Sequence, residues 1–373
     1  MEIYLDNAAT TPLSDPMKKY LTSILDLWGN PSSLYAKGTE SKRIISDARR
    51  SVARFIHAVP DHIYFTPSGS ACNTWAVRGY DKAHRHTVLY SPIAHKSILQ
   101  CAEDCQYPHP LKTDCHGFID LHDFEQRLAS CHLPPFVIID YANSEMGTIQ
   151  DVERIIALTH SCHGIVYLDC TGSIPSIPID VQKLNVDMAG FSAHKLGGLK
   201  GCGILYKKSF ITLPPFIYGS QEQGLVGGTE NILGIASAGK AVEAYDYSSI
   251  RPDGRDYVYN DIMKHIPDSY LIGAPVETGK RLPHNLYICF RGVDGESLMI
   301  LLDMYGIQVS TGSACNGRSL SPSPALSAIG INRKDIHSCI RFSFSGRETI
   351  KELDYVCATL KQCVADLRGF HVP

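Results

Sequence analysis

The chain has 373 residues, of which 44% are hydrophobic and 20% are charged, as in an ordinary globular protein. Its formal net charge of −3 gives no electrostatic reason to expect binding to nucleic acid or to an anionic membrane. The length is sufficient for roughly two domains.

The start of the chain does not look like an export signal, because Glu2 is acidic and no long apolar run follows it. No apolar run approaches the roughly 20 residues that a membrane helix needs. We therefore expect a soluble, cytoplasmic protein. Its 13 cysteines are then expected to be reduced thiols, and most of them small apolar core residues. Several Cys-His neighbours occur, but Cys-x-x-Cys does not, so no metal site is expected.

Short apolar runs alternate with amphipathic segments in the first two thirds of the chain. Apolar residues recur at helical spacing from Asp151 to Leu158. The alternation predicts an α/β domain with a mostly parallel sheet covered by helices. Ligands of such sheets bind beyond the carboxyl ends of the strands. Strands are expected at residues 62–66, 87–90, 136–140, 165–169 and 203–206.

The pattern changes near residue 250, where Pro252 and Gly254 indicate a tight connection. The remainder predicts a smaller α+β unit. Its expected elements are strands at 285–290, 307–310 and 340–344, a helix at 295–304 and a closing helix. We predict a large domain over residues 15–250 and a small domain formed by residues 1–14 and 251–373.

Lys195 follows an apolar stretch, adjoins His194 and precedes Gly197 and Gly198. A lysine that attacks a carbonyl must lose a proton, and burial or a nearby cation lowers its pKa from about 10.4. Asp169 ends the expected strand at 165–169. A Schiff-base lysine with an aspartate for a pyridinium nitrogen is the arrangement of pyridoxal phosphate enzymes. For the lysine alone, an ordinary surface position is the alternative.

Two further segments suit the same kind of ligand. Residues 65–73 run from a strand through a turn of small residues, including Gly69 and Ser70, into a helix whose first amides suit an anion. A Ser/Gly helix cap would look the same. His95 follows a strand and could stack on an aromatic ring, although capping or packing is the commoner role of a lone histidine.

Cys315 lies in a polar, glycine-spaced loop at residues 310–319, where few apolar neighbours are available for packing. A free thiol is partly ionised near neutral pH and strongly nucleophilic, and Arg318 would lower its pKa further. A nucleophilic role is therefore indicated, with an incidental exposed thiol as the alternative.

Arg341 is a cation within an apolar strand and needs a partner. Bidentate capture of a substrate carboxylate would satisfy it. A structural ion pair with an internal acid is the competing interpretation.

Together these features resemble the cysteine desulfurases of the NifS/IscS type, which are class V aminotransferases and fold-type I pyridoxal phosphate enzymes. The resemblance begins at residues 4–12 and extends to the final helix. Four motifs recur in the family's order: Gly-Asn-Pro-Ser-Ser at 29–33, Ser-Ala-His-Lys at 192–195, Gly-Gly-Thr-Glu-Asn at 227–231 and Gly-Ser-Ala-Cys at 312–315.

The resemblance implies a Schiff base between Lys195 and pyridoxal 5'-phosphate, a bond from Asp169 to the pyridinium nitrogen, and stacking and acid–base chemistry by His95. Gly69 joins the cofactor-binding set. The phosphate would be held by Ser70, Ser192 and His194, with Thr229 from the second subunit of a homodimer.

The resemblance also implies a reaction. Arg341 would bind the carboxylate of L-cysteine, and Asn30 would contribute to substrate binding. Cys315 would take the substrate sulfur as a persulfide and release alanine. The sulfur would then pass to an acceptor protein, such as a tRNA-thiolation enzyme or an iron–sulfur scaffold.

The chain departs from the family beside the cofactor's phenolic oxygen. Ser144 stands where the family usually has Asn, and Gly172 where it usually has Gln. Each lost hydrogen bond would cost roughly 1–3 kcal/mol unless another group replaces it. Three alternatives remain open: a selenocysteine lyase, a small-amino-acid aminotransferase, or a catalytically altered NifS-like subunit that serves in sulfur transfer by binding.

Overall fold

The structure is a computed structural model that describes residues 2–311 and 323–369. The helices of its first 250 residues are α1 (Asp15–Ser23), α2 (Ala36–Phe55), α3 (Gly69–Ala83), α4 (Lys96–Glu103), α5 (Leu121–Ser130), α6 (Val152–Ser161), α7 (Gln221–Gly224) and α8 (Ile232–Glu243). Short 3₁₀ turns are η1 (Pro60–His62), η2 (Ala193–Lys195), η3 (Tyr247–Ser249) and η4 (Val276–Thr278).

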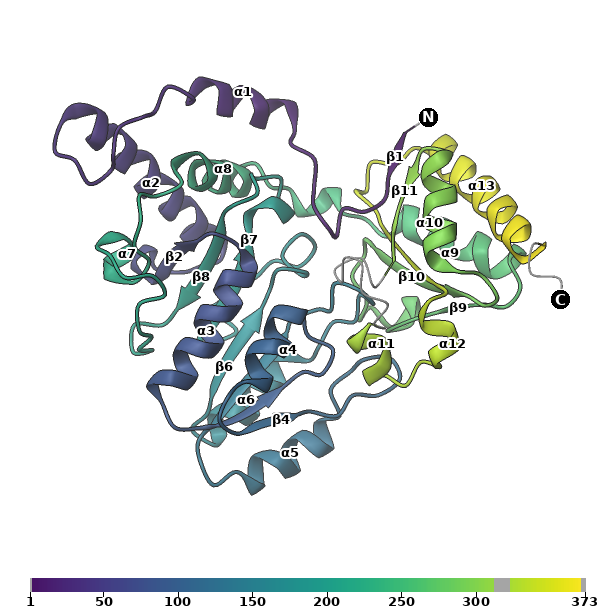
Figure 1. The fold of residues 1–373 in the computed structure, drawn as a ribbon, viewed down its shortest axis with the longest axis horizontal. Helices are drawn as coiled ribbons and strands as arrows, with labels where there is room; N and C mark the ends of the chain where they lie inside the picture. The colour runs from purple at the N-terminus through teal and green to yellow at the C-terminus, as the bar shows by residue number, and fades with distance from the viewer. Residues whose placement is uncertain (1, 312–322, 370–373) are drawn as a thin grey trace.

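A seven-stranded sheet forms the centre of the larger part of the described chain (Figure 1). Its strands are β2 (Ile63–Thr66), β3 (Thr87–Tyr90), β4 (Pro108–Pro110), β5 (Pro135–Asp140), β6 (Ile165–Asp169), β7 (Met188–Ser192) and β8 (Gly203–Lys207). Their order is β2-β8-β7-β6-β5-β3-β4, and β8 runs antiparallel to both of its neighbours. The other ladders are parallel. The carboxyl ends of β3, β5, β6 and β7 therefore share one edge.

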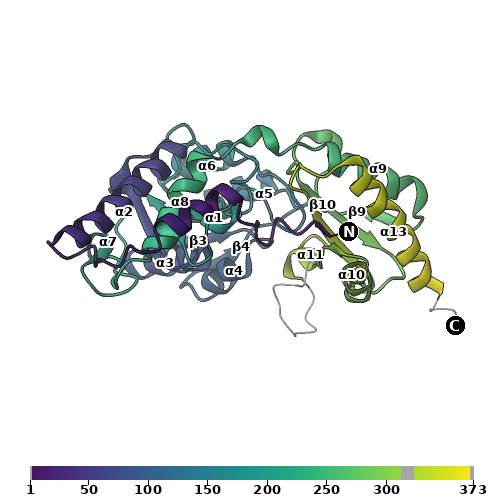
Figure 2. The same ribbon diagram turned by 90° about the horizontal axis from the view of Figure 1, so that it is seen from above.

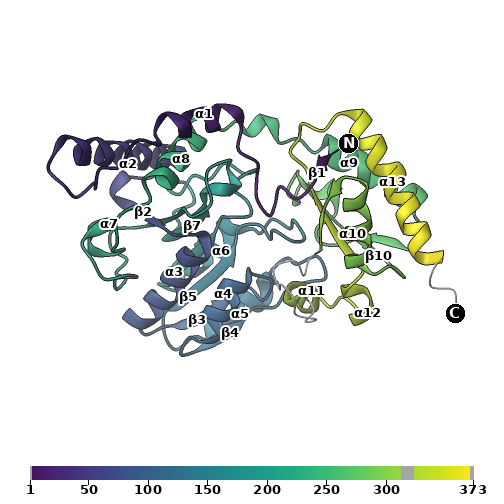
Figure 3. The ribbon, with the colours of Figure 1, turned by 45° about the horizontal axis from the view of Figure 1, so that its top comes forward.

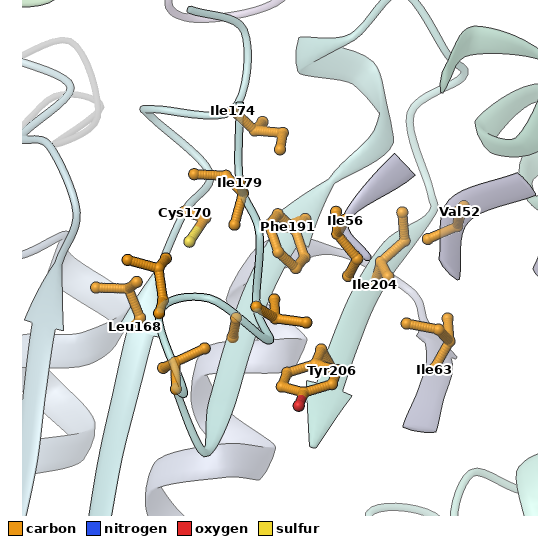
Figure 4. Packing of buried hydrophobic residues seen from close by; sticks show 14 of the residues in the cluster. Val52, Ile56, Ile63, Leu168, Cys170, Ile174, Ile179, Phe191, Ile204 and Tyr206 are labelled. Atoms are coloured by element: carbon orange, nitrogen blue, oxygen red, sulfur yellow. The ribbon is translucent and has the colours of Figure 1, made fainter. Parts of the chain in front are cut away.

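Helices cover both faces of this sheet. Buried residues of α3 and α4 pack on one face, and those of α2, α5, α6 and α8 pack on the other. Figure 4 shows Ile56, at the end of α2, beside Phe191 of β7 and Ile204 of β8. Because both faces are covered, the central strands are continuous apolar runs rather than alternating ones.

The smaller part contains an antiparallel sheet of order β12-β13-β10-β9. Helices α9, α10 and α13 cover one face of it (Figure 3). Its strands are β9 (Ser269–Leu271), β10 (Asn285–Phe290), β12 (Ser310–Thr311) and β13 (Cys339–Ser343), and its helices are α9 (Asp253–His265), α10 (Gly295–Met304), α11 (Pro324–Ala328), α12 (Arg333–Ile336) and α13 (Ile350–Gly369).

The N-terminal segment joins the two parts (Figure 2). Strand β1 (Ile3–Tyr4) pairs in parallel with β11 (Ile307–Gln308), and Asp6 forms a bridge with Ser343 of β13. A separate apolar cluster also crosses the junction, because Ile93 and Met146 of the larger part pack with Tyr287 and Leu326 of the smaller part.

The predicted fold class is confirmed, and the expected strands in the larger part agree with the structure to within one residue. Strands β4, β7 and β9 were not among the expected strands, and two details of the pairing also differ from expectation. Strand β8 reverses the otherwise parallel sheet, and the expected strand at 307–310 is two strands, since Ile307 pairs with Ile3 whereas Ser310 pairs with Arg341. Within residues 2–311 and 323–369, no helix is long and apolar enough to cross a membrane.

Candidate active site

A cavity of about 370 Å³ lies at the shared carboxyl edge of the large sheet, facing the small sheet. It brings together most of the side chains that the sequence singled out. Those on its wall are Gly69, Ser70, His95, Ser144, Asp169, Ser192, His194, Lys195 and Arg341.

Asp169, at the end of β6, is buried and accepts a hydrogen bond at each of its carboxylate oxygens. The Thr171 backbone N–H donates to Oδ1 at 2.8 Å, and Nδ2 of Asn73 donates to Oδ2 at 3.0 Å. Asn73 is itself fixed, because it accepts from the Tyr167 hydroxyl and donates to Oγ of Ser97 at 2.9 Å. Donors to both oxygens stabilise a charged carboxylate, which can pair with a cationic ligand nitrogen.

His95 stands at the start of α4, and its side chain is accessible from the cavity while protein surrounds it on the other sides. Partial loss of water around the ring lowers its pKa, the charge of Lys195 lowers it further, and Asp169 opposes both effects. The Ser97 N–H donates to Nδ1 at 3.2 Å, which leaves the proton of the neutral ring on Nε2. His95 can therefore exchange a proton with a ligand through Nε2.

Lys195 ends the turn η2 after β7 and reaches back to the N-terminal segment. Its amine donates a hydrogen bond to the carbonyl of Ala8. The adjacent His194 lies near Thr10, with Nδ1 at 3.2 Å from Oγ1. Burial lowers the pKa of His194 to about 4, with Lys195 and Lys200 adding to the effect, so this imidazole is neutral at pH 7.

The first turn of α3 borders the same cavity. Ser68 caps the helix by accepting from the Ala71 N–H at 3.1 Å. A Cβ at Gly69 would stand 3.3 Å from both Cβ of Ser192 and Oγ1 of Thr171, so a larger residue would crowd the cavity here. A helix N-terminus approached closely by backbone suits a phosphate.

Arg341 on β13 is buried and already has partners. Its Nη2 donates to Oδ1 of Asp6 at 2.7 Å, and its Nη1 donates to the Ser144 carbonyl at 3.1 Å. The ion pair named above as the competing interpretation is therefore present. Arg341 also borders the cavity, and its Nε has no hydrogen-bond partner among the described residues.

Comparison with known proteins identifies the family. The family model Aminotransferase class-V matches residues 3–356. The chain belongs to this family. It is 34% identical to a cysteine desulfurase IscS of Dictyoglomus turgidum, with coverage of 98% of this chain and 95% of that protein. It is also 34% identical to a cysteine desulfurase IscS of Methanosarcina thermophila, with 98% and 93% covered.

Solved structures agree with this assignment. A NifS-like protein superposes with a TM-score of 0.89 at 29% identity, over 98% of this chain and 100% of that one. The NifS-like protein from Rickettsia africae gives the same TM-score at 27% identity and the same coverage. The predicted resemblance is confirmed.

The two departures of this class-V aminotransferase lie against each other. A Cβ at Gly172 would stand 3.1 Å from Cβ of Ser144 and 3.0 Å from the Ala142 carbonyl. The small residues at 144 and 172 therefore form one tight contact, and a side chain at either position affects the other.

Asp140, Asn73 and Ala8 were missed as site residues. Asp140 ends β5 just as Asp169 ends β6, so a carboxylate that closes a buried strand was a usable signal for both. Burial raises the pKa of Asp140 to about 6, and the neighbouring Asp169 contributes in the same direction. Asn73 and Ala8 carry no comparable signal, because their contacts depend on the folded arrangement.

Three predicted residues are not placed on this cavity. Thr229 and Asn30 are exposed, and Asn30 accepts from the Ser32 N–H at 2.9 Å. The connection between α1 and α2, which holds Asn30, lies at the far end of the larger part from β10 (Figure 1). Cys315 lies outside the described residues, as does Arg318.

Lys195 also borders a second cavity, of about 550 Å³, together with Gly197, His284 and Arg347. It contains none of the other predicted site residues, so we regard the smaller cavity as the candidate active site. No cluster of three or more His, Cys, Asp or Glu side chains that could hold a metal occurs within the described ranges.

Proposed function

We propose that this class-V aminotransferase is an L-cysteine desulfurase that uses pyridoxal 5'-phosphate. The observation that carries the proposal is one cavity bordered by Lys195, His95 and an Asp169 with donors to both oxygens. The curated relatives named cysteine desulfurase that cover 98% of the chain support the choice of reaction.

The residues present fit the cofactor. The start of α3, with Gly69 and Ser70, suits the phosphate, and Ser192 and His194 border the same space. Asp169 suits a protonated ring nitrogen, His95 the face of the ring, and Lys195 an aldehyde carbon. When bound, the cofactor supplies an electron-withdrawing ring that makes bonds at the substrate's α- and β-carbons labile.

The chain's own side chains provide binding and proton movement. We propose that Arg341 holds the substrate carboxylate through a guanidinium edge that Asp6 does not occupy. His95 is neutral near pH 7 because its pKa is lowered, so its Nε2 can release and retake a proton beside the substrate. Lys195, when its amine is free, is a second base at the cavity.

The sulfur would be taken by Cys315. The chain leaves the described residues at Thr311 and is described again from Ser323, and Thr311 and Pro324 both border the cavity. The Cys315 thiolate forms an S–S bond to the substrate sulfur while the C–S bond breaks, and the carbon takes a proton to give alanine. One thiol and one cysteine become one persulfide and one alanine, with no external oxidant.

We further propose a homodimer in which Thr229 and Asn30 reach the cavity of the partner. Both side chains are exposed in one copy, and large apolar side chains are exposed in the same two regions: Trp28, Leu34 and Tyr35 near Asn30, and Ile217 and Tyr218 near Thr229. Exposed apolar patches of this kind mark protein interfaces.

The remaining predictions stay proposals. We propose a large domain over residues 15–250 and a small domain of 1–14 and 251–373, a cytoplasmic location, and a sulfur acceptor that is a tRNA-thiolation enzyme or an iron–sulfur scaffold. Direct binding of nucleic acid is not part of the proposal, in keeping with the net charge of −3.

A product assay tests the proposal. Purified protein supplied with pyridoxal 5'-phosphate, L-cysteine and a thiol reductant should form alanine and sulfide in equal amounts without any keto acid. Turnover that requires a keto acid would instead show an aminotransferase. A protein that binds no cofactor would remove the proposal altogether.

A further inference from the structure

Asp140 and Asp169 are direct neighbours across two parallel strands. Their Cα atoms are register partners at the last positions of β5 and β6. Side chains at paired positions of parallel strands point to the same face, and both of these residues border the candidate active-site cavity. Two buried carboxyl groups thus meet at the point where the ligand nitrogen is expected.

The two carboxyl groups differ in the hydrogen bonds that they accept. Asp169 accepts from Thr171 and Asn73, one donor for each oxygen. Asp140 is also buried, but neither of its oxygens has a hydrogen bond within the described part of the chain. Burial dominates and raises the pKa of Asp140, the Asp169 charge adds to this rise, and the backbone amide of Asp140 and the nearby Ser91 and Asn143 oppose it in part. A buried carboxyl group whose oxygens have no well-formed hydrogen bond is better accommodated in its protonated form.

Both acidic and basic side chains from other elements surround Asp140 and Asp169 in this cavity. The other acids on the cavity wall are Asp6, from the N-terminal segment, and the half-buried Glu145, on the segment after β5. Desolvation raises the pKa of Glu145, and Asp140 adds to this effect. The positive or potentially positive groups on the cavity wall are His95 and Lys96 at the start of α4, His194 and Lys195 from η2, and Arg341 from β13.

We propose that Asp140 is a positioning residue for Asp169: the pair keeps one proton, on Asp140, and releases it when a positively charged ligand nitrogen binds to Asp169. Below about pH 6 the pair then presents one negative charge in the empty cavity and two when the cation is present. The proton passes to solvent, so the step needs no other reactant. The proton on Asp140 in the ligand-free protein does not depend on the proposed function. Its release on ligand binding does, because it requires the cofactor to bind at Asp169.

Proton counting tests the release. Pyridoxal 5'-phosphate is titrated into cofactor-free protein by calorimetry at about pH 6, in two buffers of different ionisation heat, and the native chain is compared with Asp140→Asn. Proton exchange by Lys195 and by the ligand is common to both proteins and cancels. The native chain should release more protons per site, by up to about half a proton, because Asp140 is about half protonated at this pH, and the difference should vanish near pH 8, where Asp140 is already ionised.

Glu145→Gln is the matched control, since Glu145 is the other acid with a raised pKa on this cavity. It should leave the extra release in place. Equal proton counts for the native chain and Asp140→Asn would overturn the proposal, as would proton uptake by the native chain, or loss of the extra release in Glu145→Gln alone.

Infrared spectroscopy of cofactor-free protein labelled with ¹³C-aspartate gives a readout that needs no ligand. A protonated carboxyl band should fade as the pH rises through about 6 and be absent from Asp140→Asn. Its presence in the variant would overturn the assignment of the proton to Asp140. If no protein bound the cofactor, the proposed function would fail, and the band would still decide the resting state of the pair.

Discussion

The amine of Lys195 donates a hydrogen bond to the carbonyl of Ala8, 187 residues earlier in the chain. The Ala8 N–H donates in turn to Oγ of Ser343 on β13 at 2.9 Å. The N-terminal segment therefore connects the candidate Schiff-base lysine with the strand that carries Arg341. This connection explains how a small sheet and a large sheet can present their side chains to one ligand.

Lys195→Ala should abolish covalent attachment of the cofactor. Reduction of the native protein with borohydride should fix the cofactor to the peptide that contains Lys195, and the variant should stay unlabelled and lose activity by at least about 10³-fold. Lys200→Ala, at an exposed lysine on the segment that follows this turn, is the control and should keep the label. Labelling of another lysine in the native protein would contradict the assignment.

Asn73→Ala should weaken cofactor binding. The change removes one of the two donors to Asp169 and the hydrogen bond that the Tyr167 hydroxyl donates, whereas Ser97 keeps its contact with Nδ1 of His95. We expect a loss of roughly 1–3 kcal/mol in unfolding free energy and about tenfold weaker binding of pyridoxal 5'-phosphate. Urea unfolding and equilibrium binding measure the two effects. Arg78→Ala, at an exposed position of the same helix, should change neither.

Asn73 also shows where sequence reasoning stops. Asp169, Lys195 and His95 follow apolar strands, so their arrival at one sheet edge could be predicted from the strand pattern. The contact of Asn73 with Asp169 depends on how α3 packs across β6, and the contact of Lys195 with Ala8 depends on a segment that crosses between two sheets. Such pairings are set by tertiary packing and leave no local pattern.

The resemblance to the family indicated site residues that the hydrophobic pattern of the sequence could not indicate. Thr229 and Asn30 were indicated by motif alone, and in one copy both are exposed and away from the cavity. The antiparallel direction of β8 could not be predicted either. A buried apolar run in the sequence predicts a strand but does not indicate whether it pairs in parallel or antiparallel.

Replacement of Arg341 separates substrate binding from the ion pair with Asp6. Arg341→Ala should raise KM for L-cysteine by roughly 10- to 100-fold, because a charged hydrogen bond to the substrate carboxylate is lost. Asp6→Asn should change KM much less, since the guanidinium remains. Steady-state kinetics of both variants provide the comparison. An unchanged KM in Arg341→Ala with reduced stability alone would show that Arg341 is purely structural.

Asp140→Asn should change how stability depends on pH. Burial raises the folded-state pKa of Asp140 to about 6, above roughly 3.9 in the unfolded chain. The native carboxyl therefore contributes stability that is fully present below about pH 4 and lost as the pH rises through about 6. As the pH rises from 4 to 8, the free energy of unfolding of the variant should therefore increase by roughly 1–3 kcal/mol relative to that of the native protein. Urea unfolding across this pH range measures this difference. If the unfolding free energies of the two proteins depended on pH in the same way, the prediction would be wrong.

The central claim is that the chain removes sulfur from cysteine onto its own thiol at Cys315. The most direct measurement is mass spectrometry of the peptide that contains Cys315, after the cofactor-loaded protein is mixed with one equivalent of L-cysteine. We predict one added sulfur atom on Cys315, alanine in equal amount, and neither in Cys315→Ala. Full alanine formation by Cys315→Ala, with no sulfur on Cys315 of the native chain, would contradict the account.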